Sequence, residues 1–112
     1  LACVTNKAES FTLPLLKSLK IDELFGLVIS GDTLNEKKPS PLPLLHAAQH
    51  FGIKPDNCLM VGDSLNDVKA ARAAGFPVVA VSYGYNHGQD IRLAAPDAVI
   101  DNFNELSRLL TA

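Results

Sequence analysis

The chain has 112 residues, of which 47% are hydrophobic and 20% are charged, and it carries a formal net charge of −2. This composition is typical of one globular domain and excludes an intrinsically disordered chain. A weakly acidic chain lacks the electrostatic footprint of a nucleic-acid binder, and no apolar run approaches the roughly 20 residues of a membrane span, so we expect neither nucleic acid nor a membrane as a partner.

Apolar runs alternate with helical patterns through the first half of the chain. In chain order they predict a strand at residues 1–4, a helix at 12–19, a strand at 27–30 and a helix at 42–52. The first helix either carries Pro14 in its first turn or begins earlier, at Ala8. Gly52 is expected to end the second helix. The predicted apolar stripe of that helix consists of Leu44, Leu45, Ala48 and Phe51.

The second half continues the alternation. It predicts strands at residues 58–61, 77–81 and 97–100, with helices at 64–75 and 102–110. Ser64 caps the first of these helices and Gly75 ends it, while Asp101 or Asn102 caps the last. Strands rich in Val, Leu and Ile that alternate with helices indicate a mostly parallel sheet covered on both faces. We therefore predict one α/β domain, a Rossmann-like three-layer fold.

Two further features concern the origin of the chain. Cys3 and Cys58 both lie in apolar, strand-like segments, where a free cysteine behaves as a small hydrophobe. A secreted disulfide scaffold carries more cysteines, so we expect a cytoplasmic protein. The sequence begins in mid-strand with no preceding cap or turn, so we expect it to be the carboxy-terminal part of a longer chain. The sequence carries no signal for an oligomeric state.

Polar side chains follow three of the predicted strands. Thr5 and Asn6 follow the first, Lys38 follows the second, and Asp63 and Asp67 follow the third. The carboxyl ends of parallel strands meet at one edge of a sheet, so these side chains are expected to converge. Carboxylates, a hydroxyl and a lysine suit a phosphate ester bound with Mg²⁺. Asp63 is the expected metal ligand, and Asp67 acts as a water-mediated ligand or as a partner of the lysine.

Each of these residues also has an ordinary structural explanation. Asp63 at a helix start equally suits a cap, where the helix dipole favours its charge. Thr5 taken alone is more often a helix cap, and Lys38 taken alone is more often a solvated loop lysine. Only their joint placement after three successive strands favours a functional site.

Three motifs carry a resemblance to a known family. "VTNK" (4–7), "KPSP" (38–41) and "MVGDSLNDVKAARAAG" (60–75) resemble the second, third and fourth signature motifs of the haloacid dehalogenase-like hydrolases. The segment at residues 84–106 resembles the phosphoglycolate phosphatase branch. The resemblance implies a Mg²⁺-dependent phosphatase that hydrolyses a small phosphorylated acid, 2-phosphoglycolate, through an aspartyl-phosphate.

The resemblance also implies a role for each site residue. Thr5 donates its hydroxyl to the phosphoryl oxygens, helped by the backbone N–H of Asn6. Lys38, the catalytic lysine, neutralises charge on the nucleophile and the phosphate. Asp63 binds Mg²⁺ directly, while Asp67 orients Lys38 or a metal-bound water.

The chain departs from the family at its first motif. Two aspartates one residue apart, followed by Gly-Thr, are absent, and "SGDTL" (30–34) imitates them only superficially, so we predict a loop there. The cap domain is absent as well. In the resembled fold the nucleophile strand lies between the strands that end at Val4 and Val61. Residues 1–112 are therefore expected to be a partial core domain that is inactive alone.

Other functions remain open from the sequence. One is a sugar-phosphate phosphatase or mutase of the same superfamily, and another is a catalytically inactive binding module. His46 and His50 have the spacing of a zinc-protease helix, but Ala47 replaces the glutamate that acts as general base, so both are expected to be solvated. Residues 84–88 lack the glycine spacing of a dinucleotide site, and a turn is expected at His87.

Overall fold

The structure is a computed structural model that describes residues 1–84, 86 and 88–107. Its strands are β1 (Ala2–Val4), β2 (Leu27–Ile29), β3 (Met60–Gly62), β4 (Val78–Val81) and β5 (Ala98–Ile100). Its α-helices are α1 (Glu9–Ser18), α2 (Leu42–Phe51) and α3 (Leu65–Ala74). The α/β class is confirmed. Over the described part of the chain, no helix is long and apolar enough to cross a membrane.

In the second half of the chain, two predicted elements differ from the structure by more than one residue at their bounds. The third strand begins at Met60, so Cys58 lies before it, at the end of a 3₁₀ turn (Pro55–Asn57). The predicted helix at residues 102–110 starts as a 3₁₀ turn (Phe103–Glu105), in which the Asn102 side chain accepts a hydrogen bond from the Asn104 amide. Residues 108–112 lie outside the described residues.

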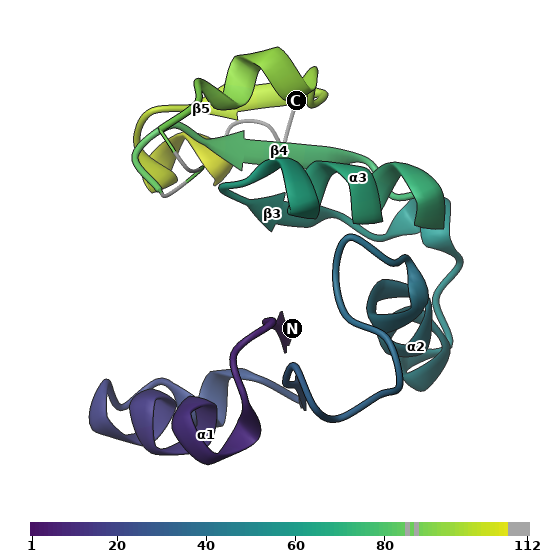
Figure 1. Ribbon diagram of the computed structural model, residues 1–112, viewed down its shortest axis with the longest axis vertical. Helices are drawn as coiled ribbons and strands as arrows, with labels where there is room; N and C mark the ends of the chain where they lie inside the picture. Colours follow the sequence, from purple (N-terminus) through teal and green to yellow (C-terminus); the bar gives the residue numbers. More distant parts are fainter. Residues whose placement is uncertain (85, 87, 108–112) are drawn as a thin grey trace.

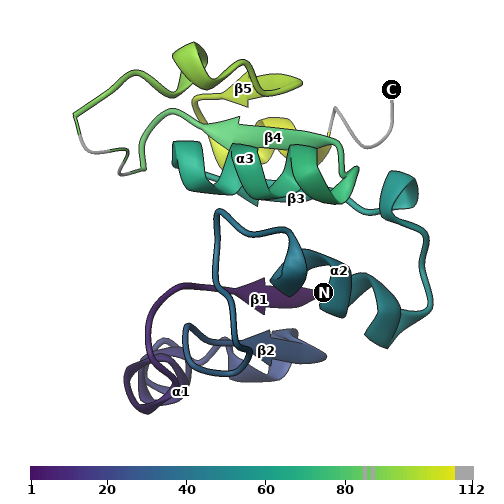
Figure 2. The same cartoon turned by 45° about the vertical axis from the view of Figure 1, so that its right-hand side comes forward.

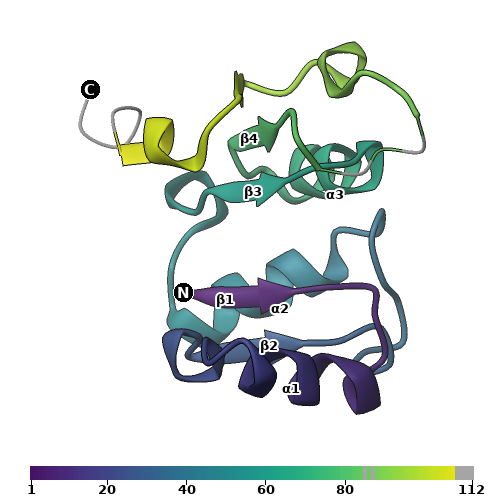
Figure 3. The same ribbon diagram turned by 90° about the vertical axis from the view of Figure 1, so that its left-hand side faces the viewer.

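All strand pairs are parallel, and they form two separate sheets. β1 pairs with β2, with Cys3 opposite Val28, and β4 lies between β3 and β5. The views in Figures 2 and 3 place β1 beside β3, and Figure 3 shows their arrows in the same direction, although no hydrogen-bonded pairing joins β1 to β3 in the described residues. The open edge of each sheet therefore faces the other.

The helices cover opposite faces of this strand array. Figure 3 shows α1 in front of the strands and α2 and α3 behind them, and Figure 1 shows α1 and α2 on opposite sides of β1. Right-handed crossovers explain this arrangement. The connection β1–α1–β2 runs toward one edge of the array and β2–α2–β3 runs in the opposite direction, so right-handed connections place α1 and α2 on opposite faces. The direction reverses between β1 and β3, which is where ligands bind in doubly wound folds.

The main core lies under α2 and α3. Ala70 and Ala71 of α3 are fully buried against Val78 and Ala80 of β4, because small side chains let the helix approach the sheet closely. The α2 stripe was predicted only in part. Its buried face consists of Leu44, Ala47 and Ala48 together with Pro43, whereas Leu45 and Phe51 are 38% and 39% exposed.

Helix ends follow the sequence signals. α1 begins after Ala8 and contains Pro14, so the earlier of the two predicted starts is the one adopted. Gly52 and Gly75 are the C-caps of α2 and α3. The loop prediction for residues 30–34 is confirmed, and Asp32 accepts a hydrogen bond at 2.9 Å from the Glu9 amide in the first turn of α1. The Asp32 carboxylate therefore satisfies a backbone amide at the N-terminus of α1, whose N-cap residue is Ala8.

Candidate functional site

A cleft of about 350 Å³ opens at the carboxyl ends of β1, β3 and β4. The residues that line it include Val4, Lys38, Gly62, Asp63, Asp67 and Tyr83. Three of the five predicted site residues thus share one cleft, although they come from segments about 30 residues apart in the sequence.

The Lys38 side chain joins the end of β1 to α3, the helix that follows β3. Its Nζ donates to the Val4 carbonyl at 2.9 Å and to Asp67 Oδ1 at 2.6 Å. The side chains of Lys38 and Asp67 are only 10% and 7% exposed. A buried, charge-assisted pair of this kind holds the ammonium group in one position, at the carboxyl end of the gap between β1 and β3.

Asp67 uses both carboxylate oxygens. While Oδ1 accepts from Lys38, Oδ2 accepts from the backbone amides of Asp63 at 2.9 Å and Ser64 at 3.2 Å. Ser64 is the N-cap of α3 and Asp67 is its third residue, so one of these bonds is the reciprocal bond of a capping box. Of the two roles left open by the sequence, these contacts favour Asp67 as the partner of the lysine.

The pKa of Asp67 reflects this environment. Burial raises the pKa of the carboxyl, but the Lys38 ammonium and the hydrogen bonds from Lys38, Asp63 and Ser64 outweigh burial and hold the pKa below its usual range. A depressed folded-state pKa favours folding at pH values above the unfolded-state pKa, which is about 3.9. The stabilisation is lost as the pH falls through the folded-state value.

We therefore expect the effect of Asp67→Asn to depend on pH. Above about pH 5 the free energy of unfolding is expected to be about 3 kcal/mol lower for the variant than for wild type, because the variant leaves the buried Lys38 charge without its partner. Below about pH 4 the difference is expected to shrink, since the wild-type carboxyl becomes protonated. Urea unfolding of the whole wild-type protein and of its Asp67→Asn variant from pH 7 to pH 3 measures this difference. A difference that stays constant over that range would contradict the assignment.

Asp63 lies between two glycines of the cleft. A Cβ atom built on Gly84 would collide with the Asp63 side chain, and one built on Gly62 would collide with Asp67. Only glycine at these positions allows the loop after β4 and the end of β3 to approach the two carboxylates so closely. Gly84 was not predicted as a site residue. The available signal was its position shortly after a strand that neighbours β3.

The carboxylate of Asp63 has the chemistry of a Mg²⁺ ligand. Mg²⁺ takes hard oxygen ligands, commonly one or two protein carboxylates together with waters and phosphate oxygens. No three His, Cys, Asp or Glu side chains gather closely enough to hold a metal ion within the described ranges. The donor set fits Mg²⁺ on the condition that further oxygen ligands come from phosphate, water or residues outside this chain.

Thr5 and Asn6 lie in the loop that follows β1. Thr5 Oγ1 accepts a hydrogen bond at 3.1 Å from the Lys7 amide, which engages a lone pair and not the hydroxyl proton. The Asn6 side chain donates from Nδ2 to the Lys38 carbonyl at 2.9 Å and accepts at Oδ1 from the Lys38 amide at 3.0 Å. The sequence had assigned Asn6 only a backbone role, so this side-chain contact is new.

A second cavity, of about 250 Å³, lies between β1 and β3, and we call it the slot. Ala2 and Val4 of β1, Met60 of β3, and Leu44, Ala47 and Ala48 of α2 line the slot. All six side chains are apolar. The slot thus follows the gap between the two sheets and ends near Val4, whose carbonyl accepts from Lys38.

Backbone groups of both strands point into the slot. The amides of Thr5 and Met60 donate on the sides of β2 and β4. Because successive residues of a strand direct their N–H and C=O groups to opposite neighbours, Ala2, Val4 and Val61 direct theirs toward the slot. An apolar slot between two parallel edges has the form of a position for one more parallel strand.

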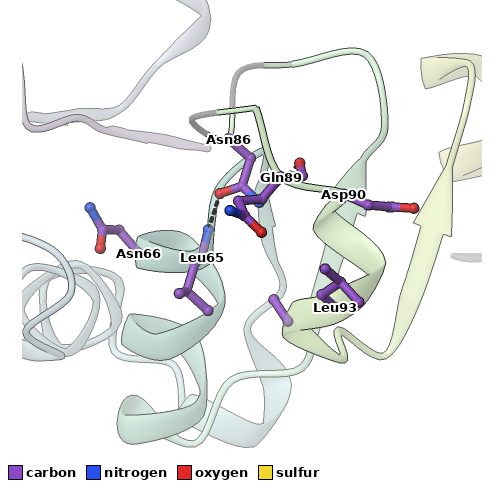
Figure 4. A pocket seen from close by; sticks show the side chains of 7 residues that line it. Leu65, Asn66, Asn86, Gln89, Asp90 and Leu93 are labelled. Atoms are coloured by element: carbon purple, nitrogen blue, oxygen red, sulfur yellow. Dashed lines mark hydrogen bonds between the residues drawn. The ribbon is translucent and has the colours of Figure 1, made fainter.

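Two other features lie outside the cleft around Lys38, Asp63 and Asp67. His46 and His50 are exposed on α2, as predicted. A hollow of about 340 Å³ lies between the start of α3 and residues 86 and 89–94, where Asn86 Oδ1 accepts from the Leu65 amide at 2.9 Å (Figure 4). Asn86 thereby helps to fix the helix end next to Asp63. The turn predicted at His87 lies outside the described residues.

Known proteins resemble this chain in sequence and in structure. A curated phosphoglycolate phosphatase from Nitrosococcus oceani is 64% identical over 109 residues, which is 97% of this chain and 48% of that protein. A crystal structure from Haemophilus somnus, described as a predicted phosphoglycolate phosphatase, is 40% identical with a TM-score of 0.95 and covers 98% of this chain and 49% of that one.

A more distant structural neighbour is CbbY from Rhodobacter sphaeroides, solved in complex with xylulose-(1,5)bisphosphate. It is 28% identical with a TM-score of 0.81, over 95% of this chain and 48% of its own. The chain spans about half the length of the curated relatives it matches.

The family model described as haloacid dehalogenase-like hydrolase matches residues 1–81, which include Thr5, Lys38 and Asp63 in their loops and Asp67 in the first turn of α3. That match covers well over half of the 112 residues. With the doubly wound arrangement and the resemblance of all three motifs, it shows that the chain belongs to the haloacid dehalogenase-like hydrolases.

Proposed function

We propose that this chain is part of a Mg²⁺-dependent phosphatase that hydrolyses a small phosphomonoester, 2-phosphoglycolate, and that the nucleophile lies on a strand outside the chain. One observation carries the proposal. The Lys38 ammonium is held by Val4 and Asp67 at the carboxyl end of an empty strand position. A carboxylate at the end of a strand in the slot would lie beside that ammonium.

The slot supports residues 1–112 as a partial core domain. Its two backbone edges and its apolar lining suit a short parallel strand with alternating apolar side chains. The known relatives are about twice as long as this chain, so they have ample sequence for such a strand and for a cap domain.

The reaction then proceeds in two steps. The carboxylate attacks phosphorus, the bond from phosphorus to the substrate's ester oxygen breaks, and the leaving alkoxide takes up a proton to give glycolate. Water next attacks the aspartyl-phosphate, which releases inorganic phosphate and regenerates the carboxylate.

The chain's own residues bind and orient the phosphoryl group. Lys38 offsets negative charge on the carboxylate and the phosphate, and Asp67 keeps the Lys38 ammonium in place. The Thr5 hydroxyl and the Asn6 backbone N–H donate to phosphoryl oxygens. Asp63 would hold Mg²⁺, which supplies charge neutralisation for the phosphoryl oxygens. In this role Asp67 acts through Lys38 or through a metal-bound water.

The choice of substrate is tested by a panel. The names of the curated relatives favour 2-phosphoglycolate, whereas the complex of CbbY favours a sugar phosphate. We expect the whole protein to have a kcat/KM for 2-phosphoglycolate at least about 100-fold above that for pentose or hexose phosphates, a difference of roughly 2.7 kcal/mol. Phosphate release with Mg²⁺ is the measurement. A preference for a sugar phosphate, or isomerisation of one, would support the phosphatase or mutase alternative instead.

We also propose a cytoplasmic location. Cys3 and Cys58 are both free, and burial raises the pKa of each thiol. Reduced thiols of low reactivity suit a reducing compartment.

The proposed partner is the small phosphorylated acid itself.

A further inference from the structure

We infer that the Asn6 side chain is a positioning residue that places Lys38 in the cleft. The inference rests on the proposed function for its catalytic consequence. The Asn6 carboxamide makes both hydrogen bonds to a single residue, donating to the Lys38 carbonyl at 2.9 Å and accepting from the Lys38 amide at 3.0 Å. The two residues are 32 positions apart in the sequence.

We call the Asn6 carboxamide and its two hydrogen bonds to the Lys38 backbone the clamp. Lys38 needs the clamp because its segment has no regular structure. Residues 31–41 form turns and bends between β2 and α2. The lysine side chain has four carbons, so fixing Nζ at Val4 and Asp67 leaves its backbone undetermined. A carboxamide carries a donor and an acceptor side by side and therefore matches the N–H and C=O of one residue. Aspartate retains the acceptor and loses the donor.

The backbone on both sides of Asn6 is held by hydrogen bonds. The Thr5 amide donates to the Ile29 carbonyl at 2.9 Å, and the Gly31 amide donates to the Lys7 carbonyl at 2.8 Å. Asn6 therefore lies between two anchors to the end of β2. A Cβ atom built on Gly31 would collide with the Asn6 carbonyl, so glycine permits this close approach.

The clamp also links the two sheets. Asn6 belongs to the loop after β1, and its side chain bonds the Lys38 backbone. The Lys38 side chain extends past the end of the slot, and its Nζ donates to Asp67 in α3, the helix after β3. β1 and β3 are not paired in the described residues, so this chain of hydrogen bonds joins their carboxyl ends. Loss of the clamp is expected to release the Lys38 backbone while α3 and its cap stay intact.

A double-mutant cycle in the whole protein tests the inference. We expect Asn6→Ala to lower kcat for 2-phosphoglycolate by about 10- to 100-fold with less than about a threefold change in KM, because a misplaced catalytic group costs mainly kcat. Asn6→Asp is expected to lie between Asn6→Ala and wild type. In a Lys38→Met background the same Asn6→Ala change is expected to alter kcat less than about twofold. Asn35→Ala, an exposed asparagine of the same segment, is the matched control.

An equal loss of kcat from Asn6→Ala in both backgrounds would overturn the inference, since Asn6 would then act without Lys38. A second readout is independent of activity. Hydrogen exchange of the Lys38 amide is expected to be at least about tenfold faster in Asn6→Ala than in Asn35→Ala. Unchanged exchange would refute the clamp, whether or not the wild-type protein releases phosphate. Failure of the wild-type protein to release phosphate would refute the proposed function instead. If Asn6→Ala fails to fold, Asn6→Asp carries both measurements.

Discussion

Replacing Asp63 by asparagine in the whole protein is expected to lower kcat/KM for 2-phosphoglycolate by at least about 100-fold, which corresponds to about 2.7 kcal/mol of transition-state stabilisation. A neutral amide is a poorer ligand for a hard cation than a carboxylate is. The two side chains have nearly the same shape, so the close contact with Gly84 is kept and the melting temperature is expected to change by less than about 2 °C. Steady-state phosphate release at several Mg²⁺ concentrations measures the effect.

Asp32→Asn is the matched control for this variant. It removes the same charge from another loop aspartate of the chain, and the amide oxygen still accepts a hydrogen bond from Glu9. We expect its kcat/KM to stay within about twofold of wild type. Wild-type turnover by Asp63→Asn would contradict the metal assignment. Loss of phosphoenzyme in Asp32→Asn would mean that the nucleophile lies at Asp32.

Much of the fold follows from local signals in the sequence. Valine-rich runs predict the strands, and Ser64 and Gly75 mark the ends of α3 as the structure has them. The alternation of strands and helices predicts the parallel pairing. The buried face of α2 was harder to predict, because the choice between Ala47 and Leu45 depends on where β1 and β3 lie and not on the helix itself.

The site was predictable to the extent that it depends on strand ends. Lys38, Asp63 and Asp67 share a cleft because each follows a strand of the same array. The side-chain contact between Asn6 and Lys38 and the packing of Gly84 on Asp63 join segments 32 and 21 positions apart. Such contacts depend on how the loops fold over the sheet edge, which no local pattern in the sequence encodes.

The second large effect concerns the slot. Backbone N–H and C=O groups that stay buried and unpaired cost about 1–3 kcal/mol each, and several of them together rival the about 5–15 kcal/mol stability of a whole domain. Ala2 and Val61 direct backbone N–H and C=O groups toward the slot, and so does the N–H of Val4, whose carbonyl already accepts from Lys38. We therefore expect the 112-residue chain alone to be poorly folded, aggregated or paired with a partner strand, and to gain stability when a strand occupies the slot.

A synthetic peptide supplies that strand. It consists of five apolar residues followed by Asp-x-Asp-Gly-Thr, and a control peptide carries proline at the middle apolar position, which removes a donor and blocks pairing. At 100 times its dissociation constant the first peptide is expected to stabilise the folded state of the chain by about 2.7 kcal/mol, which is measured as a rise in the folded fraction. The proline peptide is expected to have no effect. Equal stabilisation by both peptides would contradict strand pairing in the slot.

Phosphate release from 2-phosphoglycolate by the chain with and without this peptide, in Mg²⁺, tests one claim above all others. That claim is that the cleft around Lys38, Asp63 and Asp67 is half of a phosphoryl-transfer site, completed by a carboxylate from outside the chain. We expect no release by the chain alone, release by the mixture, and none when asparagine replaces the first aspartate of the peptide. Release by the chain alone, or by a peptide-bound chain whose peptide carries that asparagine, would contradict it.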